Sequence, residues 1–300
     1  MNEDNLKSKL EAWLADQGYP LEFAASNAFR NAGFNVFQGY HVDGEHDSRR
    51  EIDVLAQSTS REDEGFSRVS FVAECKWSND KPWVVFVAGG GIATSACIAQ
   101  SMGSESCRAI LWARNGAEEL QSLNVFRTPR PSGFGGRQAF SNNRDVFFDA
   151  MESVTQITSS YVNQYKGRDL EDSIRAVVIA FPVLVVKTRL FEASYDENVG
   201  QLCVNERPQT RIHWRGAKEW PAHATVDIVT EAHLSEFIDH CRKDTDVLLP
   251  FLQESAKSLR ECVSSRSLQG LKLNRASTGL SGRPSLLRRL DKWFSAPPPK

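Results

Sequence analysis

The sequence predicts an α/β fold in which a helix, a meander of three strands, a second helix and a fourth strand form the core. Three observations carry this prediction. Apolar residues recur at helical spacing between residues 20 and 33, and Gly33 is suited to end that helix as a C-terminal cap. Strand-like runs separated by polar turns then fill residues 34–77. The short apolar segment CRAILWAR at 107–114 reads as a further buried strand.

The rest of the chain adds helices and strands around this core. Leu6, Leu10, Trp13 and Leu14 indicate an amphipathic first helix. The other patterns predict a strand or helix start at 82–91, a helix at 92–102, a loop at 127–143, a long helix at 144–165, one or two strands at 174–188, a hairpin at 189–206 that turns near Asn198, strands at 210–216 and 223–230, and a helix at 231–263. The turn between the second and third strands is expected at 58–65.

These patterns divide the chain into four segments. We expect an N-terminal helix at 1–17, the core at 18–115, an additional α+β region at 116–250 and a basic, partly disordered tail at 251–300. The tail holds ten Lys/Arg against three acids, which leaves it at +7 and the first 250 residues at −9 within a net charge of −2. Because the body is acidic, total charge alone does not predict a nucleic-acid partner.

The chain has the composition of a globular protein, with 41% hydrophobic and 25% charged residues. Its six cysteines show no CxxC spacing, so neither a zinc site nor a disulfide framework is expected. The acidic, amphipathic start does not resemble a signal peptide, and the apolar run at 176–186 is too short to cross a bilayer and contains Pro182. We therefore expect a cytoplasmic protein without a membrane partner.

A charged pair interrupts the third strand pattern, SFVAECKW. Strand side chains alternate between faces, so Glu74 and Lys76 share one face while Cys75 lies on the other. A half-exposed hairpin with ordinary surface charges is the simplest alternative, but it explains poorly why this pair lies between the apolar residues FVA and Trp77.

A second acid lies in the preceding strand. Alternation there puts Asp53 and Glu51 on one face, opposite Ile52 and Val54. If the two strands form a hairpin, Asp53 converges with Glu74. Two carboxylates that stay ionised when buried need a cation or hydrogen-bond donors, which points to a divalent metal ion. Mg²⁺ prefers such oxygen ligands, and a nearby ammonium suits phosphodiester hydrolysis.

Asp53, twenty intervening residues and then Glu74-Cys75-Lys76 resemble the motif of the PD-(D/E)XK nuclease superfamily, which includes restriction endonucleases. The resemblance covers about residues 18–115 and implies a restriction-endonuclease-like core. Ile52 stands where the family motif has proline.

The resemblance also implies roles for individual residues. Asp53, Glu74 and Lys76 would be catalytic, and Glu22 on the preceding helix would join Asp53, Glu74 and the carbonyl of Cys75 around Mg²⁺, with Mn²⁺ as a substitute. Glu22 flanks the apolar arc of its helix, so it is placed to reach the edge of the sheet. Glu51 is a further candidate ligand, although a solvated strand end is the simpler interpretation.

The function that this resemblance implies is a Mg²⁺-dependent DNA endonuclease in restriction, antiviral defence or repair. The alternative is a catalytically silent DNA-binding or scaffold subunit of a larger defence complex, and the acidic body favours that alternative or a nuclease that needs a partner subunit. A homodimer is the other assembly left open. The candidate DNA contacts are Lys81, Arg283, Arg288 and Arg289, each with an ordinary surface role as the alternative.

Overall fold

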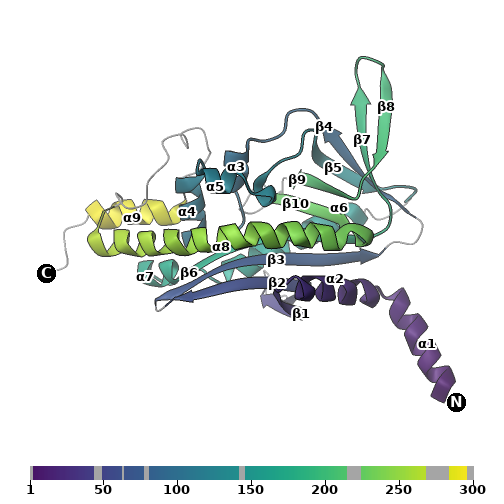
Figure 1. The fold of residues 1–300 in the computed structure, drawn as a ribbon, viewed down its shortest axis with the longest axis horizontal. Helices are drawn as coiled ribbons and strands as arrows, with labels where there is room; N and C mark the ends of the chain where they lie inside the picture. The colour runs from purple at the N-terminus through teal and green to yellow at the C-terminus, as the bar shows by residue number, and fades with distance from the viewer. Residues whose placement is uncertain are drawn as a thin grey trace.

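A large mixed sheet forms the centre of the described structure. The computed structural model describes residues 3–43, 49–62, 64–77, 81–141, 146–214, 224–267 and 284–295. Within these ranges, ten strands follow the order β1-β2-β3-β6-β10-β9-β5-β4-β7-β8 (Figure 1). The strands are β1 (Asn35–Asp43), β2 (Arg49–Glu62), β3 (Gly65–Trp77), β4 (Trp83–Ala88), β5 (Ser132–Gln138), β6 (Ala176–Lys187), β7 (Leu190–Asp196), β8 (Gln201–Glu206), β9 (Gln209–Trp214) and β10 (Ala224–Thr230).

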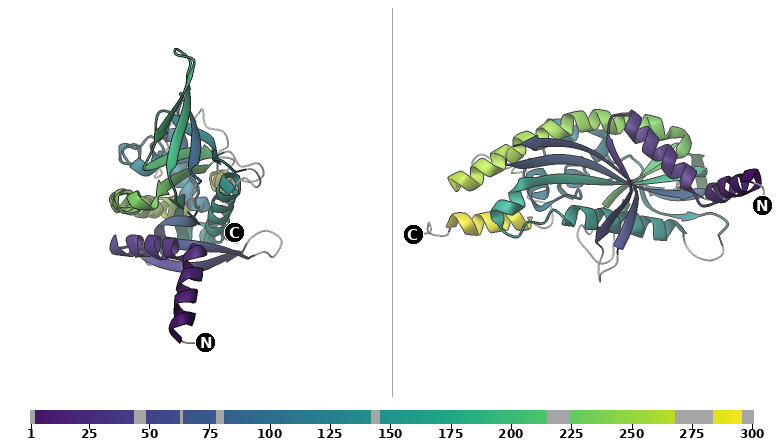
Figure 2. Two further views of the ribbon diagram at one scale, coloured as in Figure 1. Left: turned by 90° about the vertical axis from the view of Figure 1, so that its right-hand side faces the viewer. Right: turned by 90° about the horizontal axis from the view of Figure 1, so that it is seen from below.

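Helices cover both faces of the sheet. They are α1 (Glu3–Asp16), α2 (Tyr19–Asn31), α3 (Thr94–Ala99), α4 (Glu105–Arg114), α5 (Glu118–Gln121), η2 (Asn124–Phe126), α6 (Val146–Asn163), α7 (Leu170–Arg175), η3 (Glu231–His233), α8 (Leu234–Ser265) and α9 (Ser285–Ser295). Figure 2 shows α8 and α2 on one face and α6 on the other. Among the helices described here, none combines the length and the apolar character that crossing a membrane requires.

The first helix of the predicted core begins and ends where its sequence indicates. Pro20 lies in the first turn of α2, where its missing N–H costs no helical hydrogen bond. Gly33 follows the helix with a φ of 83°, a conformation that glycine adopts without strain. Leu21, Ala25 and Phe29 are buried against β2 and β3, so α2 is fixed on the sheet beside the predicted site.

β6 is the central strand of the sheet. Its sequence AVVIAFPVLVVK is buried at every position except the last, because helices cover both of its faces. β6 pairs in parallel with β3 on one side and with β10 on the other. The segment predicted as one or two strands is therefore a single strand, despite Pro182 in its middle.

The expectation that residues 107–114 form a strand is wrong. They belong to α4, which begins after Ser104, whose side chain accepts a hydrogen bond from the backbone N–H of Cys107. A short apolar run fits a buried helix as well as a buried strand, and here the helix buries Ile110 and Leu111. The strand that pairs in parallel with β3 is β6, which lies outside residues 18–115.

Two predicted irregular segments are also strands. The turn expected at 58–65 is much shorter, since β2 and β3 stay paired as far as Glu62↔Gly65. Residues 132–138 of the predicted loop form β5, which pairs with β4. The glycines of β5 reflect close packing, because a Cβ on Gly136 would lie 2.5 Å from Phe147. Glycine was therefore a misleading loop signal in this segment.

The C-terminal segment contributes two helices to the described structure. α8 continues through Pro250 to Ser265, so the first part of the predicted tail belongs to a long helix. Ser285–Ser295 form α9, in which Leu286, Leu287 and Leu290 are fully buried. The side chains of Ser285 and Arg289 both donate hydrogen bonds to Glu105 of α4. This part of the tail is thus a packed element of the fold.

Replacing Leu287 by alanine should lower the free energy of unfolding by about 2–5 kcal/mol, the usual cost of truncating a buried leucine. Urea unfolding of the full chain measures the change. The exposed neighbour Arg288 provides the control, because Arg288→Ala removes no buried surface. Equal stability of Leu287→Ala and the parent would show that α9 does not pack on the body.

Candidate functional site

The candidate site lies where two paired strands separate. β2 and β3 are paired as far as Val54↔Ala73. Beyond that point β3 stays on β6 as far as Trp77, while β2 stays on β1 as far as Arg49. Asp53 and Glu74 are the next residues on the two strands, so they lie at the point of divergence.

The side chain of Asp53 bridges the two strands at this point. Its Oδ2 accepts a hydrogen bond of 2.8 Å from the backbone N–H of Cys75. The carboxylate thereby takes a donor that a strand carbonyl would otherwise use, and it is held beside the Glu74-Cys75-Lys76 segment. Asp53 thus lies beside the segment that carries Glu74, and the charge of Glu74 acts on its carboxyl group.

The strict alternation expected for β2 breaks at Asp53. Val54 packs in the apolar cluster with α2 and α8, whereas Ile52 packs in the cluster with α6. The expectation that Ile52 and Val54 share a face is therefore wrong. Gly39 on β1, between the partners of these two residues, has a φ of 60°, which marks a local irregularity of the β1–β2 pair.

Glu74 is buried with an incomplete set of partners. The residue is 7% exposed, and its Oε1 lies 2.5 Å from the Nζ of Lys76. Its Oε2 is buried and has no hydrogen-bond partner within the described residues. A buried carboxylate oxygen without a donor is costly, so this atom is suited to accept a cation or a hydrogen-bond donor from outside the chain.

Burial, with repulsion from neighbouring acids, raises the pKa values of Asp53 and Glu22. Burial raises the pKa of Asp53 to about 7, with repulsion from Glu74 and Glu22 adding to the rise, while the Cys75 N–H and Lys76 oppose it. Burial raises the pKa of Glu22 as well, with a contribution from Glu51. One ammonium thus offsets several neighbouring carboxylates, and a divalent cation would relieve the remaining repulsion.

Glu51 and Cys75 also surround this centre. Glu51 is exposed, as its interpretation as a solvated strand end requires, yet its charge reaches Glu22. Burial, followed by repulsion from Asp53, raises the pKa of the Cys75 thiol well above its ordinary value. The thiol is therefore uncharged, and any contribution of Cys75 to a metal site would come from its carbonyl, as predicted.

The metal-free protein should become less stable as the pH rises from about 4 to about 8. The folded state keeps a proton on Asp53 up to about pH 7, whereas an unfolded aspartate loses it near pH 4, so the folded state binds more protons over this interval. Asp53→Asn should flatten the dependence by a few kcal/mol, an order-of-magnitude value.

Thermal unfolding in EDTA across this pH range tests the prediction. Asp239→Asn, a change at an exposed aspartate of α8, is the matched control and should keep the slope of the parent. If Asp53→Asn keeps that slope too, the carboxyl of Asp53 does not carry the linkage.

The residues fit a hard divalent cation in their chemistry, though not as a finished coordination shell. Carboxylate oxygens are the ligands that Mg²⁺ prefers, and Glu74 Oε2 lacks a partner. In the part of the chain that the structure describes, no three His, Cys, Asp or Glu side chains are grouped closely enough to hold a metal ion as they stand. Binding would therefore require the acidic side chains to move closer together around the ion.

The other predicted DNA contacts lie apart from one another. Lys81 is exposed just before β4, and its carbonyl accepts a hydrogen bond from Thr188. Arg288 is exposed on α9, whereas Arg289 is bound to Glu105. α9 lies at the end of the molecule away from the C-terminal end of β3 (Figure 1). Arg283 is outside the described residues.

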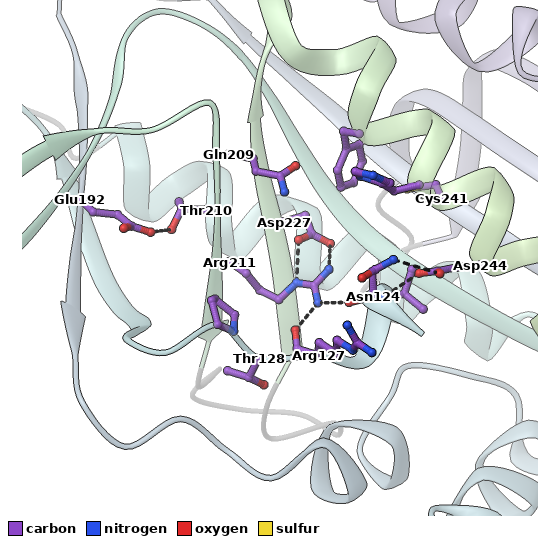
Figure 3. Close-up of a pocket in the computed structure, with 14 residues that line it drawn as sticks. Asn124, Arg127, Thr128, Glu192, Gln209, Thr210, Arg211, Asp227, Cys241 and Asp244 are labelled. Carbon is purple, nitrogen blue, oxygen red and sulfur yellow. Dashed lines mark hydrogen bonds and ion pairs between the residues drawn. The ribbon is translucent and has the colours of Figure 1, made fainter. Parts of the chain in front are cut away.

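Sequence reasoning missed a second polar cluster on β9 and β10. Figure 3 shows Arg211 and Asp227 facing each other beside α8, in a cavity of about 420 Å³. The pair is bidentate, at 2.7 and 2.9 Å, and Arg211 also donates to the carbonyls of Asn124 and Arg127. The available signal was a single formal charge within each strand pattern, Arg211 in TRIHW and Asp227 in TVDIV.

The polar groups of this cavity hold a connecting segment in place. Arg211 fixes two carbonyls of the segment, and Asp244 of α8 accepts hydrogen bonds from the backbone N–H of Val125 and the side chain of Asn124. These groups are satisfied by the protein itself. The cluster therefore explains how the segment after α5 is fixed between α8 and the sheet.

Comparison of the chain with protein-family models, with curated proteins and with solved structures found no match in any of the three.

Proposed function

We propose that the protein is a metal-dependent nuclease that hydrolyses phosphodiester bonds of DNA at the site formed by Glu22, Asp53, Glu74 and Lys76. The observation that carries the proposal is the site at the separation of β2 and β3. There, a buried carboxylate with a free oxygen, a second carboxylate of raised pKa and an ammonium lie together.

The order of elements supports the resemblance to the PD-(D/E)XK superfamily. α2 precedes the meander β1-β2-β3, α4 follows it, and β6 is the strand beside β3. A restriction-endonuclease-like core would then consist of these six elements, with β4, β5 and α6 as insertions before β6. In this assignment the two motif strands are β2 and β3, and the acid of the preceding helix is Glu22.

Each residue has a role in the proposed chemistry. Glu22, Asp53, Glu74 and the carbonyl of Cys75 would hold Mg²⁺ or Mn²⁺, which would polarise a phosphoryl oxygen and lower the pKa of a water molecule. Lys76 donates hydrogen bonds from Nζ to the attacking water and to the phosphate, where negative charge develops. Water attacks phosphorus in line, and the expected products carry 5′-phosphate and 3′-hydroxyl ends, as is usual in the superfamily.

A catalytically silent DNA-binding or scaffold subunit is the second candidate. Two observations favour it: the close ion pair occupies Lys76 and one oxygen of Glu74, and the described acids do not form a finished metal site. The acidic body, at −9 over the first 250 residues, also favours a partner subunit for DNA binding. Restriction, antiviral defence and repair are the settings that suit either function.

Incubation with three substrates separates these functions. Supercoiled plasmid, linear duplex and single-stranded DNA are each incubated with Mg²⁺, Mn²⁺ or EDTA. The proposal predicts cleavage with either metal and none in EDTA, and nicking of the closed circle identifies an endonuclease. DNA binding without cleavage under every condition would support the silent subunit and contradict the nuclease.

A further inference from the structure

The β7–β8 hairpin projects from the body and ends in an exposed edge. Figures 1 and 2 show it extending beyond the helices that cover the rest of the sheet. β8 is the last strand in the sheet order, so within the described residues no strand lies on its outer side. All six of its side chains are exposed. Such an edge offers free backbone donors and acceptors to another strand.

One face of this hairpin is apolar. Cross-strand pairing places Tyr195 beside Leu202 and Ala193 beside Val204, and alternation puts both pairs on the same face. Phe86 of β4 lies beside Ala193 and continues the face across a third strand. Leu202 is 74% exposed and Val204 is 58% exposed. A contiguous exposed apolar surface of this kind marks an interaction site.

We propose that β8 pairs in antiparallel orientation with β8 of a second copy of this chain, about a two-fold axis at Cys203. A two-fold axis normal to the sheet keeps every side chain on its own face, so opposed residues must come from the same face. With the axis at Cys203, Leu202 lies opposite the partner's Val204 and Gln201 lies opposite the partner's Asn205. Apolar side chains then lie opposite apolar ones, and polar side chains lie opposite polar ones.

Neighbouring registers are less favourable. An axis at Val204 would bring Leu202 against Glu206, and an axis at Leu202 would bring Val204 against Gly200. In each of these antiparallel registers, the acidic tip at Asp196 and Glu197 lies beside the base of the partner hairpin and away from the other acidic tip.

Charges at the base of the hairpin fit this arrangement. Arg189 is bound to Glu206, and Arg207 is bound to Glu192. The axis at Cys203 therefore opposes no unpaired like charges along β8.

The DNA backbone is negatively charged and binds to basic surfaces, so an apolar face with an acidic tip does not suit it. The partner that pairs with this edge is therefore a protein. A second copy satisfies the free edge and places Leu202 beside the partner's Val204, so that the apolar face continues across the junction. This inference is independent of the proposed nuclease activity.

Sedimentation of the full chain at micromolar concentration tests the assembly. The expected mass is twice the 33.6 kDa of one chain. Leu202→Lys combined with Val204→Lys would oppose lysines across the axis and should weaken the dimer roughly ten-fold or more. Val247→Lys, at an exposed position of α8, is the matched control and should leave the dimer intact. A monomeric parent, or a dimer that resists the double change, would overturn the proposal.

Oxidation tests the register. Directly opposed residues of antiparallel strands have Cα atoms about 4.5–5.5 Å apart, within the range that a disulfide spans. Cys203 is the exposed cysteine among the described residues, and the others are buried or half-buried. Copper–phenanthroline with dioxygen as the oxidant should convert two Cys203 thiols into an intermolecular disulfide, which Cys203→Ser should abolish. A dimer that does not cross-link through Cys203 would contradict this register.

Discussion

Lys76→Ala should slow DNA cleavage by roughly two or more orders of magnitude, the scale of losing one preorganised donor to the transition state. Lys76 lies at the end of β3 and contributes little apolar surface to the core, so with Mg²⁺ present as the counter-charge of Glu74 the melting temperature should change little. Its Nζ is the cation beside Glu74 Oε1. Removing it leaves the carboxylates free for a metal ion, and Mg²⁺ binding should persist.

Two further variants define the role of this lysine. Lys76→Arg should not restore full activity, because a planar guanidinium does not replace a compact ammonium. Lys187→Ala removes a partly exposed lysine from the adjacent end of β6 and should leave cleavage near that of the parent. Melting, Mg²⁺ titration and plasmid cleavage are measured on the same preparations. Lys76→Ala that cuts as fast as the parent would make Lys76 a surface residue and refute this mechanism.

Asp227→Ala should lower the free energy of unfolding by about 3–5 kcal/mol, because it leaves the largely buried guanidinium of Arg211, whose side chain is 12% exposed, without its counter-ion. It should also loosen the segment that Arg211 holds through the carbonyls of Asn124 and Arg127. Urea unfolding gives the first effect, and hydrogen exchange at Val125 gives the second.

An exposed ion pair supplies the control for this change. Glu206→Ala breaks the pair with Arg189 on the β7–β8 hairpin, where solvent already screens both charges, and it should hardly change stability. If Asp227→Ala is as mild as Glu206→Ala, the Arg211–Asp227 pair does not hold the two strands and the segment together.

The sequence predicts the part of the fold whose patterns are long and regular. The helix at 20–33, the three strands that follow it and the hairpin at 189–206 are all present, because apolar periodicity and turn residues agree there. Residues 107–114 fail because eight apolar-rich residues suit helix and strand alike, and the Ser104 cap decides for helix. β5 fails because its glycines serve close packing and not a turn.

The candidate site is predictable in its residues but not in its geometry. Alternation along SFVAECKW correctly suggests that the side chains of Glu74 and Lys76 meet. The Oε1 atom of Glu74 and the Nζ atom of Lys76 lie 2.5 Å apart. The separation of β2 and β3, and the hydrogen bond from Cys75 to Asp53, depend on which strands pair at each end of the sheet. Local periodicity carries no such information, and it likewise gives no hint that Arg211 and Asp227 pair across β9 and β10.

Titration of the metal-free protein with Mg²⁺ at pH 7, in two buffers of different ionisation enthalpy, tests most directly whether Glu22, Asp53 and Glu74 hold one divalent cation. We predict one ion per chain. Because the pKa of Asp53 is about 7, binding of the Mg²⁺ ion should release about half a proton per chain at this pH. Glu74→Gln should abolish both the binding and the proton release. The absence of binding by the parent with either Mg²⁺ or Mn²⁺, or equal binding by Glu74→Gln, would contradict the proposed site.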